Sequence, residues 1–149
     1  MSIKISSGLR DHVLATGSFA AGVNGGIIKI YSGTVPATAD AALSGNTLLA
    51  TISNNMAGTG INMAATSSAG VLPKATAEVW KGLITTSGTA TFYRFLPIAG
   101  TETLSTTEKR LQGTVATVGG DLNFSSTAFV ANGTNSKTVD SFYITQPTA

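Results

Sequence analysis

Apolar side chains recur at every fourth position near the start of the chain. Ile5, Leu9 and Val13 follow this spacing, which is typical of one face of a helix. Ser7 is a suitable N-cap for that helix, and Gly17 is a suitable stop. The pattern predicts a short helix with one apolar face.

The residues after this helix interrupt the pattern. Residues 20–26 read AAGVNGG, a composition that predicts a flexible joint. We therefore expect a single domain, 1–149, in which residues 1–24 form a helix and glycine-rich arm and residues 25–149 a β-sandwich or barrel. The arm is expected to pack either on its own β-domain or on a neighbouring copy, and we hypothesise that it is an assembly arm.

From residue 26 onwards the pattern is typical of strands. Short runs rich in β-branched residues are bounded by Gly, Asn and Ser. They predict a mainly β fold, an antiparallel β-sandwich or barrel of about seven to nine short strands. Residues 36–43 are expected to form helical turns, and residues 97–109 a polar loop. The expected strands cover residues 26–33, 47–53, 61–65, 78–84, 88–96, 110–118, 121–126 and 138–145.

The expected strand over residues 88–96 holds the densest group of aromatic residues. Because side chains alternate along a strand, Phe92 points to one face and Tyr93 and Phe95 to the other. We therefore expect both faces of this strand to be covered. Further along, Gly119 and Gly120 predict a hairpin turn.

Composition narrows the classes of function. The 149 residues include no Cys, which excludes thiolate catalysis and cysteine metal sites, and a single His, which excludes multi-histidine metal sites. Only 11% of residues are charged, against about 25% in an average domain. Either Ser, Thr and Asn solvate the surface or other subunits cover part of it. We favour assembly into a homo-oligomer.

The charges do not form a patch. The nine basic residues are scattered, and the adjacent pair Lys109-Arg110 has Glu108 beside it. Nucleic-acid binding requires clustered cations, so direct contact with nucleic acid is not expected. No window is apolar enough for a signal peptide or a membrane span, so we expect neither export by a standard route nor a membrane partner.

Candidate catalytic groups are few. Asp11 and His12 are neighbours, but adjacent residues on a helix point about 100° apart, so Asp11 is poorly placed to orient His12. The glycine-rich residues 22–26 precede a strand, whereas phosphate-binding loops follow one. The acidic residues are widely separated. We expect no enzyme activity, no cofactor and no metal site.

Two further features leave alternatives open. Trp80 and Tyr93 are expected in the core, but on an open strand face they would form a carbohydrate-binding platform. Arg94 lies between aromatic residues, either at a rim with its stem packed or against a carboxylate across an interface, where arginine is enriched. Candidate assembly-interface residues are Ile5, Leu9, Val13 and Arg94.

Several segments, in order along nearly the whole chain, resemble small structural proteins of tailed bacteriophages. The resemblance is weakest over residues 97–109 and after residue 130. The matching segments are residues 7–10 (SGLR), 25–33 (GGIIKIYSG), 35–40 (VPATAD), 47–52 (TLLATI), 78–80 (EVW), 87–95 (SGTATFYRF) and 110–115 (RLQGTV).

The resemblance implies a part of the virion, assembled in the cytoplasm of the bacterial host, with no catalytic residues to carry over. The function expected first is capsid decoration: a cement protein that binds the outer head surface as an oligomer, with a trimer favoured, and clamps the major capsid protein. The first alternative is a neck, tail or fibre-attachment protein. An alternative of another class is a receptor- or carbohydrate-binding module of the virion.

Overall fold

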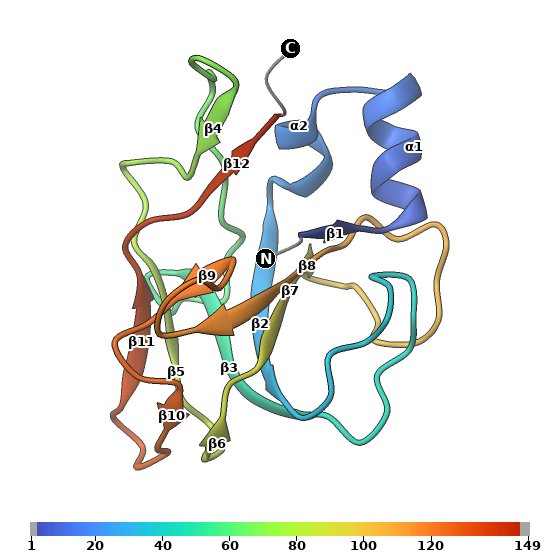
Figure 1. Ribbon diagram of the computed structural model, residues 1–149. Coiled ribbons are helices and arrows are strands. Elements are labelled where there is room, and N and C mark those ends of the chain that lie inside the picture. The colour runs from blue at the N-terminus through green and yellow to red at the C-terminus, as the bar shows by residue number, and fades with distance from the viewer. Residues whose placement is uncertain (1–2, 147–149) are drawn as a thin grey trace.

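The computed structural model describes residues 3–146 and is mainly β, with 38% of residues in strands and 10% in helices. This confirms the predicted fold class. Its elements follow one another along the chain as Figure 1 shows. They are β1 (Lys4–Ile5), α1 (Ser7–Ala15), α2 (Phe19–Val23), β2 (Gly26–Ser32), β3 (Thr47–Asn54), β4 (Val71–Pro73), β5 (Trp80–Leu83), β6 (Gly88–Thr89), β7 (Phe92–Pro97), β8 (Leu111–Ala116), β9 (Leu122–Asn123), β10 (Ala128–Phe129), β11 (Ser136–Val139) and β12 (Tyr143–Thr145).

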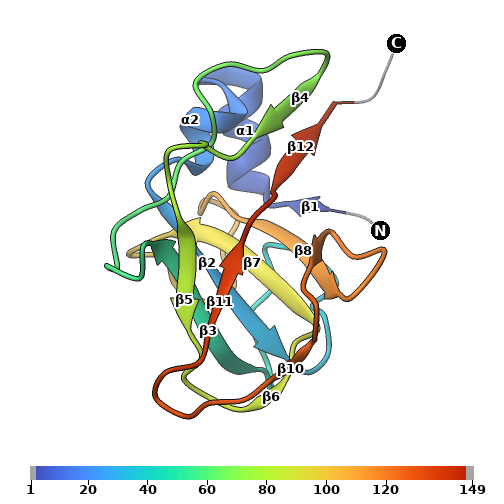
Figure 2. The same cartoon turned by 90° about the vertical axis from the view of Figure 1, so that its left-hand side faces the viewer.

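One large sheet organises the molecule, with the order β1-β8-β7-β2-β3-β5-β11 and antiparallel pairing throughout this path. The sheet curves without closing into a barrel, an arrangement compatible with a sandwich. β9 pairs with β8 off this path, and two small sheets, β10-β6 and β12-β4, complete the fold. Figure 2 shows that the helices and the β12-β4 pair lie at one end of the curved sheet.

The N-terminal helix forms where the apolar spacing predicts it, but its cap is shifted by one residue. Ser6 caps α1, since its side chain accepts a hydrogen bond from Leu9 N–H. Ser7 binds Asp40 instead, through its backbone N–H and its hydroxyl. Leu9 is fully buried and belongs to the core, so the helix packs on its own sheet.

The predicted flexible joint is wrong over much of its length, because residues 19–23 form α2. Ser18 caps this helix, and Val23 is buried. Gly22 allows α2 to approach α1: a Cβ there would lie 2.6 Å from Leu9 Cδ1. The glycine serves close packing of two helices.

Several strand predictions are corrected in detail. Residues 36–43 form bends with no helical turn, and residues 88–96 divide into β6 and β7. Residues 138–145 divide between β11, which pairs with β5, and β12, which pairs with β4. The hairpin expected at residues 119–120 is absent, because β9 runs parallel to β8.

The core lies inside the curve of the sheet and gathers aromatic rings from distant strands. Trp80 packs against Phe95 and Phe142, with ring centroids 5.8 and 5.5 Å apart, and Tyr93 also meets Phe142. Phe92 points to the opposite face of β7, where its ring stacks on Tyr31. Both faces of β7 are therefore covered, as the aromatic pattern predicts.

Candidate assembly sites

A cluster of charged and polar groups, here called the polar cluster, covers the outer face of β7 and β8. Its members are held by strands on one side and by loops 33–46 and 98–110 on the other. Two fully buried arginines are at its centre. The members are Tyr31, Arg94, Glu102, Glu108, Arg110 and Gln112.

Arg94 is enclosed by partners from its own chain. Its guanidinium donates to Glu102 Oε2 at 3.0 Å, to Gln112 Oε1 at 3.0 Å and to the carbonyl oxygen of Ala41 at 2.8 Å. Gln112 faces Arg94 across β7 and β8, and its amide also donates to Pro36 O. The cluster thus fastens loop 33–46 to the sheet. The structure gives Arg94 an intramolecular carboxylate partner and an enclosed position, not a rim position.

Arg110 makes the corresponding contacts with loop 98–110. Its guanidinium donates to Glu108 Oε2 at 2.7 Å and to the carbonyl oxygens of Thr101 and Thr103 at 2.7 and 2.8 Å. It also reaches the carbonyl oxygens of Ala39 and Asp40. The two loops, which contain little regular secondary structure, are therefore held together through one buried cation.

The ionisation of the cluster follows from burial and its internal contacts. Burial raises the pKa of Tyr31, and the hydrogen bond of its hydroxyl to Glu102, 2.5 Å long, raises it further. Burial lowers the pKa of Arg94, while Glu102 opposes that effect. Burial by itself raises the pKa of Glu108, but hydrogen bonds from Thr101 and Arg110 outweigh it, and the pKa is lowered.

The sequence reasoning singled out Arg94 but missed its partners. A signal was present in the alternation over residues 110–115, where Arg110, Gln112 and Thr114 are polar and the residues between them are not. Such alternation places polar groups on one face of a strand. The contribution of Glu102 had no such signal, because it comes from a loop.

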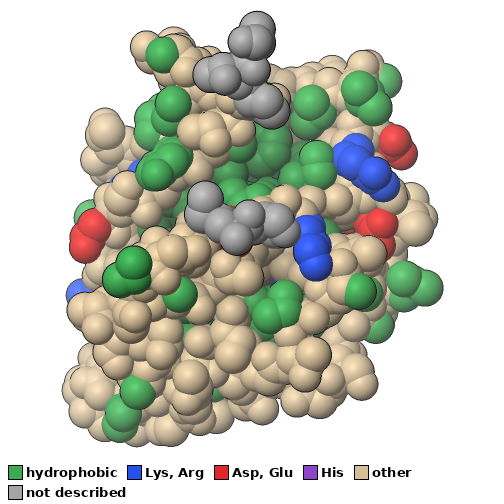
Figure 3. All heavy atoms as spheres, viewed as in Figure 1, with side chains coloured by type: hydrophobic (Ala, Val, Ile, Leu, Met, Phe, Trp, Pro, Cys, Tyr) green, Lys and Arg blue, Asp and Glu red, His purple; other side chains and the backbone are tan. Residues whose placement is uncertain are grey.

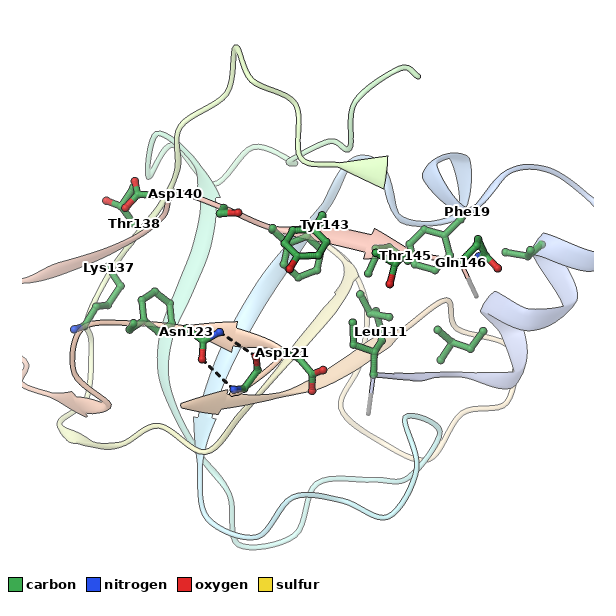
Figure 4. A pocket seen from close by; sticks show the side chains of 18 of the residues that line it. Phe19, Leu111, Asp121, Asn123, Lys137, Thr138, Asp140, Tyr143, Thr145 and Gln146 are labelled. Carbon is green, nitrogen blue, oxygen red and sulfur yellow. Dashed lines mark hydrogen bonds between the residues drawn. The ribbon is translucent and has the colours of Figure 1, made fainter. Parts of the chain in front are cut away.

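The second candidate site is a groove of about 1180 Å³. It lies between the two edges of the open sheet, at β1 and at β11. One wall comes from α1, β1 and the β9 region, and the other from β11 and β12 (Figure 4). In the space-filling view, apolar side chains gather in the hollow between the helices and the C-terminal strands (Figure 3). Its apolar lining includes Ile3, Ile5, Val13, Leu14, Phe19, Leu111, Phe142 and Tyr143.

The predicted interface residues fall into two groups. Ile5 and Val13 line the groove, and Leu14 beside them is 84% exposed. Leu9 and Arg94 are enclosed within the chain. The prediction of a contact with a partner is therefore carried by Ile5 and Val13, the two residues that reach the surface.

The aromatic platform has no open face. Trp80 and Tyr93 are fully buried. Trp80 donates through its Nε1 to Glu78, whose carboxylate also accepts from the backbone and side chain of Asn62. The large exposed aromatic residue is Tyr143, which is 57% exposed at the groove.

The catalytic candidates are not brought together. Asp11 is exposed, whereas His12 is half-buried with its Nε2 atom enclosed and without a hydrogen-bond partner. Over residues 3–146, no group of three or more His, Asp or Glu side chains is placed to bind a metal ion. Within the same residues, neither helix has the length and apolar character needed to cross a membrane.

No protein-family model matches the chain, and no significant similarity links it to the curated proteins or to the solved structures.

Proposed function

We propose that the chain is a non-enzymatic structural protein of a phage virion, a capsid decoration protein that binds the outer head surface as a homo-oligomer, with a trimer favoured. In this role it stabilises the shell by bridging copies of the major capsid protein. Many weak contacts, repeated over the particle, supply the stabilisation.

The observation that supports this proposal most is the way the chain distributes its charge. Arg94 and Arg110 are fully buried, and their carboxylate partners Glu102 and Glu108 are mostly enclosed. Four of the sixteen charged side chains are therefore used inside the fold. The surface that remains is poorer in charge than a soluble monomer needs, which favours a subunit covered by neighbours.

The groove supports the same proposal. Exposed apolar side chains on α1 and β12, among them Leu14 and Tyr143, line the groove beside Ile5 and Val13. Contiguous apolar surface of this kind marks contact sites in soluble proteins. A structural subunit uses such a surface for assembly.

The test is the copy number of this protein per purified virion, measured by quantitative mass spectrometry against the major capsid protein. A number comparable to that of the major capsid protein is expected for a decoration protein. A number typical of one ring would contradict decoration and favour the neck, tail or fibre-attachment alternative. Absence from purified particles would overturn the virion proposal altogether.

A complementary test uses the isolated protein. Shells lacking the protein are expected to resist heat less well, and added protein is expected to restore their resistance. Light scattering coupled to size-exclusion chromatography measures the oligomer, for which a trimer is expected. Failure to bind shells would contradict the decoration role.

A further inference from the structure

The groove exposes the unpaired edges of two strands. On either side of β12, Phe142 O accepts from Lys74 N–H and Gln146 N–H donates to Gly70 O, so the backbone groups of Tyr143 and Thr145 point away from β4. Just before β11, Asn135 O accepts from Ile84 N–H on the β5 side. By the same alternation, Ser136 and Thr138 direct their backbone groups away from β5.

These free edges border the groove. The four residues Ser136, Thr138, Tyr143 and Thr145 all belong to its lining. Within the described part of the chain, the backbone N–H groups of these residues have no hydrogen-bond acceptor outside their own sheets. An extended backbone laid along β11 and β12 would satisfy them, as in β-strand addition.

An unpaired carboxylate oxygen in the groove lining points to the same kind of occupant. Asp121, which lines the groove, accepts from Thr114 through Oδ2, whereas its Oδ1 atom is buried without a partner among the described residues. A polypeptide offers backbone N–H donors to such an oxygen.

The size of the groove favours a polypeptide over a small molecule. Its volume of about 1180 Å³ exceeds the range of about 300–1,000 Å³ found for small-molecule pockets. The wall formed by residues 136–146 is long and follows the direction of two successive strands (Figure 4). An extended segment fits this shape.

Charge at the two ends specifies the segment further. Arg10 of α1 lines one end, and its guanidinium donates to Ser7 Oγ without a carboxylate partner among residues 3–146. Asp140 and Lys137, of opposite charge, lie at the opposite end, beyond Tyr143 (Figure 4). The complementary segment carries an acidic residue where it passes Arg10 and apolar residues at alternate positions over the groove floor.

We propose that this groove binds an extended strand from a different protein chain, which pairs with β11 and β12. Under the proposed function, on which this assignment rests, that chain is a neighbouring virion protein. A second copy is the less suitable occupant, because its own free edges, on β11 and β12, lie within its own groove and face the wall formed by α1, β1 and the β9 region. Two recessed edges do not reach each other.

The experiment uses the full chain and a displayed library of random peptides as the probe. Selected peptides are expected to show apolar residues at alternate positions and an acidic residue near one end. Their affinity is then measured for Tyr143→Lys, for Thr145→Pro and for the control Leu104→Lys. Leu104 is an exposed leucine on loop 98–110, outside the groove lining.

Tyr143→Lys and Thr145→Pro are each expected to weaken binding by about tenfold or more, as loss of a central contact does, whereas Leu104→Lys leaves it unchanged. Thr145→Pro removes an N–H that points away from β4, so the β12-β4 pairing is kept. On binding, the amides of Ser136, Thr138 and Thr145 are expected to become protected from hydrogen exchange.

Two outcomes would overturn the assignment. The first is selection of peptides whose affinity is the same for all three variants. The second is a mass, measured by light scattering, that falls from oligomer to monomer on Tyr143→Lys, which would make a second copy the occupant. A virion copy number typical of a shell protein, found together with either outcome, would leave the proposed function standing.

Discussion

The two faces of β7 are both buried, but they are covered by different means. On the inner face, Tyr93 and Phe95 join an aromatic cluster with Trp80 and Phe142. On the outer face, Arg94 joins hydrogen bonds and ion pairs that hold two loops. Apolar burial needs no particular direction, whereas a charged network fixes each loop by specific contacts. The outer face therefore orders segments that have little secondary structure of their own.

The largest expected effect tests the inner face. Trp80→Ala removes a fully buried ring and its bond to Glu78, and is expected to lower the free energy of unfolding by about 3–5 kcal/mol. Because Trp80 is the chain's single tryptophan, urea unfolding is followed by circular dichroism. Trp80→Phe, which keeps a ring, is the control and is expected to cost less. Equal losses in the two variants would contradict a packing origin.

The next effect tests the outer face. Arg94→Met keeps the length of the side chain but removes the guanidinium that donates to Gln112, Glu102 and the carbonyl oxygen of Ala41. We expect a loss of about 3 kcal/mol, the lower end of the range for a broken buried pair, since Glu102 is 21% exposed and near Lys29.

Limited proteolysis separates the two faces. In Arg94→Met, cleavage within loop 33–46 is expected to appear before global unfolding, because that loop loses one of its anchors. In Trp80→Ala, cleavage is expected to follow global unfolding throughout the chain. Early cleavage of this loop in both variants would break the distinction between the faces.

A matched pair of hydroxyl deletions sharpens the comparison. Tyr31→Phe removes the hydroxyl that donates to Glu102, and is expected to cost about 1 kcal/mol. Tyr93→Phe removes a buried hydroxyl that has no partner, and is expected to be neutral or slightly stabilising. Both unfolding free energies are measured in urea. A larger loss for Tyr93→Phe would show that its hydroxyl has a partner in solution.

The smallest expected effect concerns the loss of stability at low pH. The pKa of Glu108 is lower in the folded chain, so its contribution is present above the unfolded value of about 4.3 and is lost as the pH falls through the folded pKa. Glu108→Gln is therefore expected to make stability less sensitive to acid below about pH 5. Glu78, beside Trp80, also has a lowered pKa, so Glu78→Gln is expected to change the acid sensitivity in the same direction. Parallel acid limbs for wild type and Glu108→Gln would contradict the role of Glu108.

The local pattern of apolar and polar residues predicts the mainly β fold, the first helix and the burial of both faces of β7. Alternation and apolar spacing indicate which side of an element is covered. The prediction of a flexible joint at residues 20–26 is wrong because glycine composition does not distinguish flexibility from close packing. Here Gly22 allows the close packing of two helices. The prediction of a hairpin turn at residues 119–120 is also wrong. Asp121 accepts a hydrogen bond from the Thr114 hydroxyl, and β9 then runs parallel to β8.

The candidate sites were less predictable than the fold. Ile5 and Val13 were identified as surface contacts, but the opposite wall of their groove comes from residues 136–146, which the sequence places far away. Arg94 was identified, but its carboxylate partner comes from a loop. Contacts between residues distant in sequence depend on topology, which hydrophobic periodicity does not specify.

The pairing of β1 with β8 has a consequence for synthesis of the chain. Lys4 lies opposite Gln112, and Ser6 donates through its hydroxyl to Glu108 O and through its N–H to Arg110 O. On the ribosome, residues 4–6 emerge before their partners, which follow more than 100 residues later in the sequence. Pairings of such wide separation slow folding. The groove wall that β1 provides is therefore completed only after β8 has been made, so shorter nascent chains do not present the complete groove.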